Sequence, residues 1–146
     1  FDGNTYIVFE GGTALHISQN DIGYVSSAYS DGLTATATDV YASDNEASVQ
    51  KLGVSGHTEL ASPTSGEADY AGIAGDGNDL YIAYIKNNAA YVKRYVSNDW
   101  EPFPKGSSGV VSTKSGLSDI EISAKDGQIA VGIVCSDGIF VYKLVK

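Results

Sequence analysis

The chain has 146 residues, in which 18 acidic side chains outnumber 9 basic ones, so the formal net charge is -9. This length suits one domain with a substantial core. The negative charge repels phosphate backbones and anionic lipid surfaces, so we expect no nucleic-acid partner. No run of about 18 apolar residues occurs, and no basic start precedes a hydrophobic region, so neither a membrane span nor a signal peptide is expected.

Cysteine and methionine usage adds two expectations. Cys135 is the one cysteine, so no disulfide can form within the chain, and its place in an apolar run predicts a small buried hydrophobe. Domains of this size can be stable without disulfides, so the lack of a disulfide does not exclude an exported protein. The chain contains no methionine and opens at Phe1, so we expect a processed product or a piece of a longer protein.

Short alternating runs between turn-forming clusters predict antiparallel strands in four successive units. The first unit has predicted strands at residues 4–10, 13–19 and 23–29. A compressed second unit spans residues 33–63, with a first strand at 33–38, a short second strand V-Y-A-S and a third at 47–52. No window shows helical spacing with a cap, so helix is expected to be nearly absent.

The third unit, residues 70–104, is the most regular. It reads D-L-Y-I-A-Y-I-K, A-A-Y-V-K-R-Y-V and W-E-P-F, separated by N-N and S-N-D, after a first strand at 70–75. The last unit repeats three of these strands at 118–124, 128–133 and 139–144. The Gly- and Ser-rich loop 105–116 is predicted to be mobile, and 62–68 is its counterpart one repeat earlier.

The spacing of equivalent valines indicates the architecture. Val49, Val92 and Val141 lie 43 and 49 residues apart, and each is followed by any residue, then a basic residue, then a large apolar one. Units of this length with several short strands are typical of propeller blades. The predicted fold is therefore all-β, with β-propeller-like four-stranded antiparallel blades, about three and a half repeats and about fourteen strands in one domain, residues 1–146.

The third unit resembles the blade repeats of secreted bacterial β-propellers in its Tyr-rich strand ending in Ala-Tyr, its Val-plus-basic strand and its Trp-Glu turn. The resemblance covers residues 70–104 well, 118–145 moderately and 1–63 weakly. It implies a blade and a secreted or cell-surface protein, but no chemistry. Unpaired strand edges at both ends imply that another chain, or a parent segment, completes the ring of sheets.

Candidate metal ligands and nucleophiles are sparse. His16 and His57 stand alone in different units, so zinc is not expected, and no G-x-S-x-G motif accompanies the serines. Asp76 and Asp79 flank Gly77-Asn78, where closely spaced glycines and hard oxygen ligands allow a calcium contact. Asp-Gly or Gly-Asn between two strands is first of all a hairpin turn, so calcium is the alternative, and no other cofactor is predicted.

Acidic and aromatic residues supply the candidate sites. Glu67 with Asp69, and Asp119 with Glu121, each share a strand face at the start of a first strand, which suits either solvated acids or the acids of a polysaccharide hydrolase or lyase. Tyr81 and Tyr84 are expected to point to opposite faces, and Trp100 either packs in the core or forms a ligand platform.

The function predicted from these features is a non-catalytic binding or scaffold module of an exported or surface protein. It would recognise a glycan or a protein through loops on one face, at 44–46, 67–69, Asn87-Asn88, Asp137 and 105–116. Whether the chain is an enzyme stays open: the hydrolase or lyase is the alternative, and a purely structural spacer is the third interpretation. The predicted ligand-binding residues are Asn87, Asn88, Trp100, Glu67, Asp69 and Asp119.

Overall fold

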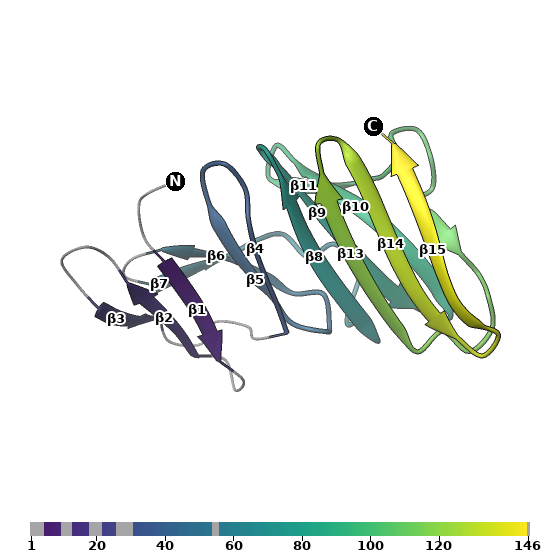
Figure 1. Cartoon of the computed structure of the whole chain (residues 1–146), viewed down its shortest axis with the longest axis horizontal. Coiled ribbons are helices and arrows are strands. Elements are labelled where there is room, and N and C mark those ends of the chain that lie inside the picture. Colours follow the sequence, from purple (N-terminus) through teal and green to yellow (C-terminus); the bar gives the residue numbers. More distant parts are fainter. Residues whose placement is uncertain (1–4, 10–12, 18–21, 26–30, 54–55, 146) are drawn as a thin grey trace.

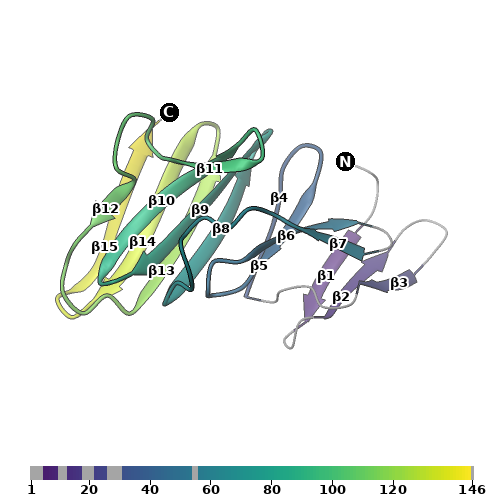
Figure 2. The ribbon, with the colours of Figure 1, turned by 180° about the vertical axis from the view of Figure 1, so that it is seen from behind.

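The protein is described by a computed structural model that covers residues 5–9, 13–17, 22–25, 31–53 and 56–145. Side chains are described from residue 31 onward. The described residues form an all-β structure of 15 strands without a helix (Figures 1 and 2). Accordingly, none of them forms a helix long and apolar enough to cross a bilayer. The predicted all-β class is confirmed.

Four antiparallel sheets follow one another along the chain, and in each the strands pair mainly with their neighbours in sequence. The first sheet contains β1 (Thr5–Phe9), β2 (Thr13–Ile17) and β3 (Ile22–Val25). The second contains β4 (Gly32–Ala35), β5 (Val40–Ser43), β6 (Val49–Gly53) and β7 (Gly56–Glu59). These are the predicted first two units, and the parts of the predicted strands at 4, 10, 18–19 and 26–29 lie outside the described residues.

The third sheet has β8 (Tyr70–Asp76), β9 (Asp79–Lys86), β10 (Ala89–Val96) and β11 (Asp99–Pro102), with β12 (Val110–Ser112) also paired to β10. The fourth has β13 (Asp119–Lys125), β14 (Gln128–Cys135) and β15 (Gly138–Val145). The 49-residue spacing holds for three strands of each sheet, since β13, β14 and β15 match β8, β9 and β10 position by position.

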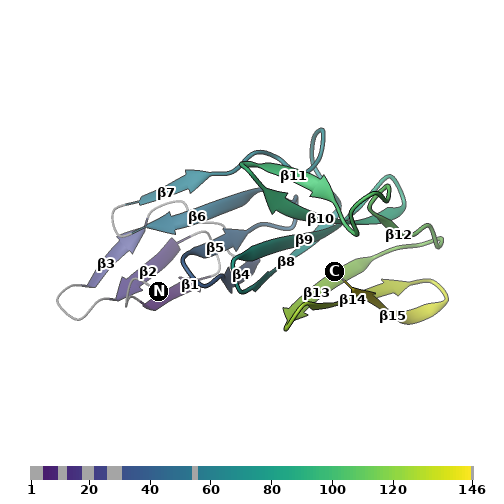
Figure 3. The same ribbon diagram turned by 90° about the horizontal axis from the view of Figure 1, so that it is seen from above.

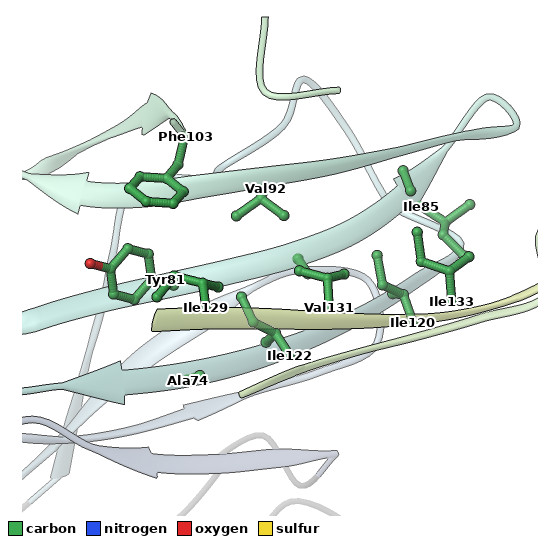
Figure 4. Close-up of a cluster of buried hydrophobic side chains, with 12 residues drawn as sticks. Ala74, Tyr81, Ile85, Val92, Phe103, Ile120, Ile122, Ile129, Val131 and Ile133 are labelled. Carbon is green, nitrogen blue, oxygen red and sulfur yellow. The ribbon is translucent and has the colours of Figure 1, made fainter. Parts of the chain in front are cut away.

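The last three sheets are stacked face to face, with their first strands β4, β8 and β13 lying side by side (Figure 3). The third sheet is therefore covered on both faces. On β9, Tyr81 belongs to the cluster shared with the fourth sheet and Tyr84 to the cluster shared with the second, as the alternation predicted. Figure 4 shows the first cluster, in which Ile120, Ile122 and Val131 face Tyr81 and Val92.

Close backbone approach between β8 and β4 depends on Gly75. Its amide donates to Thr34 Oγ1 at 2.8 Å, and a Cβ at this position would clash with the carbonyl group of Ala35. A residue with a side chain could not sit here without moving one of the two strands. The close packing of the second sheet on the third therefore requires glycine at position 75.

Two expectations are corrected. Residues 36–38 form a turn rather than the end of a strand, because Thr36 and Asp39 bond to each other through backbone and side chain. The predicted mobile loop 105–116 contains β12, whose residues Val110 and Ser112 pair with Tyr91 and Ala90. Backbone pairing to an open sheet edge outweighs the Gly and Ser content of the loop. The four sheets form an open series and do not close into a ring within the described part of the chain.

Candidate functional site

Connections between strands gather at two opposite ends of the stack. The turn end, uppermost in Figure 1, holds the hairpin turns at 36–39, 76–79, 96–99 and 125–128. The loop end holds the connections 44–48, 65–69, 86–89, 115–119 and 135–138. Strand direction alternates, so every second connection of a meander must reach the same end. The loop end is the face on which the sequence placed the candidate ligand-binding loops.

Hydrogen bonds fix the connections at the loop end. The Ala68 amide donates to the Glu46 carbonyl at 3.1 Å, which ties the second sheet to the segment entering the third. Lys86 Nζ donates to the carbonyls of Ser65 and Gly66 at 2.6 and 2.9 Å. Ser136 Oγ donates to the Ser115 carbonyl at 2.9 Å. Connections 44–48, 65–69 and 86–89 are thus linked to one another, and 115–119 is linked to 135–138.

Negative charge dominates the loop end. Its acids belong to five different connections or strand starts and are listed here: Asp31, Asp44, Glu46, Glu67, Asp69, Asp119 and Asp137. Asp44 is the most enclosed, because its carboxylate accepts from the Ser48 amide at 2.8 Å. Burial raises the pKa of Asp44 above its ordinary value, the bonds from Ser48 act against that rise, and nearby Asp31 adds to it.

Asn87 and Asn88 form the β9–β10 turn at the centre of the loop end, and both are exposed. Their φ angles of 50° and 57° are left-handed, the conformation that two-residue hairpins need and that asparagine tolerates. The turn chemistry alone thus accounts for both residues being asparagine. Their amide groups are nevertheless free to face a ligand beside Lys86, which sequence reasoning did not single out.

Glu67, Asp69 and Asp119 are exposed at the loop end, where strands β8 and β13 begin. The Asp69 amide donates to Ile85, and the Asp119 carboxylate accepts from the Ile120 amide at 2.9 Å. Within the described residues, no hydrogen bond links the three carboxylates to one another. The arrangement places them on one surface, and the hydrolase or lyase interpretation remains a prediction.

Trp100 lies elsewhere. It is 5% exposed, near the turn end of the third sheet, where its ring packs on Tyr95 with centroids 5.0 Å apart. The indole Nε1 donates to the Ala61 carbonyl at 2.6 Å. The length of β10, on the order of 20 Å at about 3.3 Å per residue, separates Trp100 from Asn87 and Asn88. Of its two predicted roles, the structure has Trp100 packed in the core.

Asp76 and Asp79, the calcium candidates, lie at the turn end with protein partners. Asp76 accepts from the amides of Asp126 and Gly127 at 3.0 and 2.7 Å, so it caps the turn of the next sheet. Asp79 pairs with Arg94 at 2.5 Å and accepts from the Tyr81 hydroxyl at 3.2 Å. No group of three or more His, Cys, Asp or Glu side chains suited to a metal ion occurs in the part of the chain that the structure describes.

The cysteine and the two histidines considered in the sequence lie on strands. Cys135 is a buried free thiol at the end of β14, as predicted. His57 lies on β7, and its Nδ1 is buried without a hydrogen-bond partner among the described residues. His16 lies on β2, where side chains are not described.

Comparison with known proteins gives no relative: no protein-family model matches the chain, and no curated protein matches it in sequence.

Proposed function

We propose that this chain is a non-catalytic binding module with propeller-like blades, which recognises a ligand at the loop end. Stacked meander sheets, first strands side by side and repeat spacings of 43 and 49 residues support the blade architecture. An exported or surface protein, whose ring of sheets is completed by another chain or a parent segment, fits this architecture.

The observation that carries the proposal is the hydrogen bonding that fixes the connections at the loop end. The bonds between residues 46 and 68 and between 65–66 and 86 fix connections of the second and third sheets to each other, and the bond between 115 and 136 fixes two connections of the fourth sheet. Pre-formed surfaces bind with a smaller entropy cost than flexible loops. The seven acids at this end favour a neutral glycan or a basic protein segment over an anionic ligand.

A glycan array followed by calorimetry tests the proposal. The diagnostic variant is Asn87→Gly with Asn88→Gly, because glycine removes both amide groups yet keeps the left-handed turn. The matched control is Ser97→Gly with Asn98→Gly, since these residues have φ angles of 52° and 69° in the same kind of turn at the turn end. We expect the first double variant to lose binding and the control to keep it. Equal binding by both variants would count against the loop end.

The catalytic alternative is tested on the same preparations. Release of reducing ends or unsaturated products from a polysaccharide, lost in Asp119→Asn, would replace the binding module with a hydrolase or lyase.

A further inference from the structure

The outer edge of β15 differs from that of its counterpart β10. In the third sheet, β11 pairs with residues 93–96 of β10 and β12 pairs with residues 90–91, so this edge is covered. In the fourth sheet, the described residues give β15 one neighbour, β14. Unpaired backbone groups along such an edge can accept a further strand.

A hollow beside β15 corresponds to the place that Trp100 fills in the third sheet. There the indole lies against the segment 61–63 and Lys93 donates to the Pro63 carbonyl. Adding 49 residues to positions 61, 63 and 93 gives Val110, Ser112 and Tyr142. These three, with Val111, Thr113 and Lys114, line an open hollow of about 400 Å³.

Hydrogen bonds confirm that the two places are equivalent. The Asp69 amide donates to Ile85, and the Ser118 amide donates in the same way to Val134, 49 residues later. Likewise Lys93 bonds to residue 63, and Tyr142 donates to Ser112 Oγ at 3.3 Å. The counterpart of Ala61, whose carbonyl accepts from the indole, is therefore Val110, which lines the hollow.

The outer face of the fourth sheet is a weaker candidate for docking. Its exposed side chains include Ile139 at 75% and Val141 at 73%. The fourth sheet approaches the third sheet closely at Gly72 on β8, where a Cβ would be 3.4 Å from the Ile120 carbonyl oxygen. The equivalent residue of the fourth sheet, 49 positions later, is Glu121. A further sheet could not pack there in the same way, because it would meet a charged side chain instead of a glycine.

We propose that the β15 edge and this hollow bind an extended peptide strand that carries a Trp-Glu pair. In the third sheet, Trp100 is opposite Tyr95 and Glu101 is opposite Arg94. The counterparts on β15 are Leu144 and Lys143, which offer an apolar neighbour for the indole and a positive charge for the glutamate. Backbone pairing supplies affinity, and these two side chains set the register.

The probe is a fluorescent peptide with the sequence of residues 97–103, S-N-D-W-E-P-F, titrated with the 146-residue chain in a fluorescence-anisotropy assay. We expect saturable binding, and at least about tenfold weaker binding when alanine replaces the peptide tryptophan. This comparison changes the peptide alone, so it does not depend on the folding of a protein variant. Equal affinity of the two peptides would overturn the proposal.

Two charge reversals locate the site on the protein. Lys143→Glu on β15 should weaken binding about fivefold, whereas Lys125→Glu, an exposed lysine on the far strand β13, should leave it unchanged. Peptide binding should also slow amide exchange along β15. An equal effect of both reversals, or exchange slowed elsewhere only, would contradict the assignment. A dimer that persists with saturating peptide and is lost in Lys143→Glu would assign the edge to a second copy instead.

Discussion

The third and fourth sheets are built from equivalent strands, but their surroundings differ. The third sheet is packed on both faces and its outer edge is covered by β11 and β12. The fourth is packed on one face, and equivalent side chains on the other face are exposed, as Val92 at 0% and Val141 at 73% show. A strand's local pattern therefore determines its pairing, whereas its neighbours determine how much each position contributes to stability.

The largest loss of stability is expected when the third sheet loses the tryptophan that has no counterpart among the described residues of the fourth. Trp100→Ala empties the place between Tyr95 and Ala61, so we expect the free energy of unfolding to fall by about 4 kcal/mol. Urea denaturation measures the change. Trp100→Phe keeps a ring but loses the indole hydrogen bond, and should cost less. A loss below about 1 kcal/mol for the alanine variant would mean that Trp100 is not a core residue in solution.

Glycines allow the next comparison. Gly75→Ala should destabilise the protein by about 3 kcal/mol, because its Cβ would displace the β4 backbone at Ala35. Gly132→Ala on β14 is the control, since no atom lies within 4 Å of its Cβ. Thermal unfolding of both variants gives the difference. Equal melting temperatures would show that β4 and β8 are farther apart than described.

Val92 and Val141 test burial at register-equivalent positions. Val92→Ala should lower the free energy of unfolding by about 2 kcal/mol, and Val141→Ala by less than about 0.5 kcal/mol. Chemical denaturation at several protein concentrations provides the measurement. If the Val141 variant lost as much stability as the Val92 variant, a second molecule would be covering the outer face of the fourth sheet.

The smallest expected effect is a loss of stability at alkaline pH, and it concerns the face of the third sheet that packs on the second sheet. Burial raises the pKa of Tyr84 to about 12, since its ring faces the second sheet, whereas an unfolded tyrosine ionises near 10. The contribution of Tyr84 is therefore complete below pH 10 and is lost as the pH rises toward 12. Its counterpart in the fourth sheet is Ile133, which has no proton to lose.

We expect Tyr84→Phe to lose less stability between pH 10 and 12 than the parent chain, as followed by denaturation at each pH. Tyr70→Phe, which removes a hydroxyl from an exposed ring, is the control. The same loss in all three proteins would remove Tyr84 as the cause. Tyr41, whose pKa burial likewise raises to about 12, would then be the next residue to change.

Much of this fold follows from the sequence. Alternation and turn residues located the strands of the third and fourth units within about two residues, and the 49-residue spacing predicted their equivalence. The gathering of 44–46, 67–69 and 87–88 at one end also followed, because strand directions alternate. Propeller-like blades and ligand recognition remain predictions.

Other features depend on contacts that a local pattern does not contain. β12 forms because part of the β10 edge is left uncovered by β11, so its Gly- and Ser-rich surroundings did not reveal it. The position of Trp100 follows from the segment 61–63 crossing its face, which no spacing rule predicts. Lys86 was missed as a loop-end residue for the same reason, since its acceptors are backbone carbonyls some 20 residues earlier.

The bonds from Asp76 also bear on how the fourth sheet opens. Its carboxylate holds the amides of Asp126 and Gly127, so the hairpin of β13 and β14 is fastened to the third sheet at its tip. Among the described residues, β15 has no strand at its outer edge, and it is attached by the β14 ladder, by its buried face and by the bond from the Tyr142 hydroxyl to Ser112. Local unfolding should therefore begin at β15 and stop at β14. The last strand would then open and close on its own while the rest of the stack stays folded.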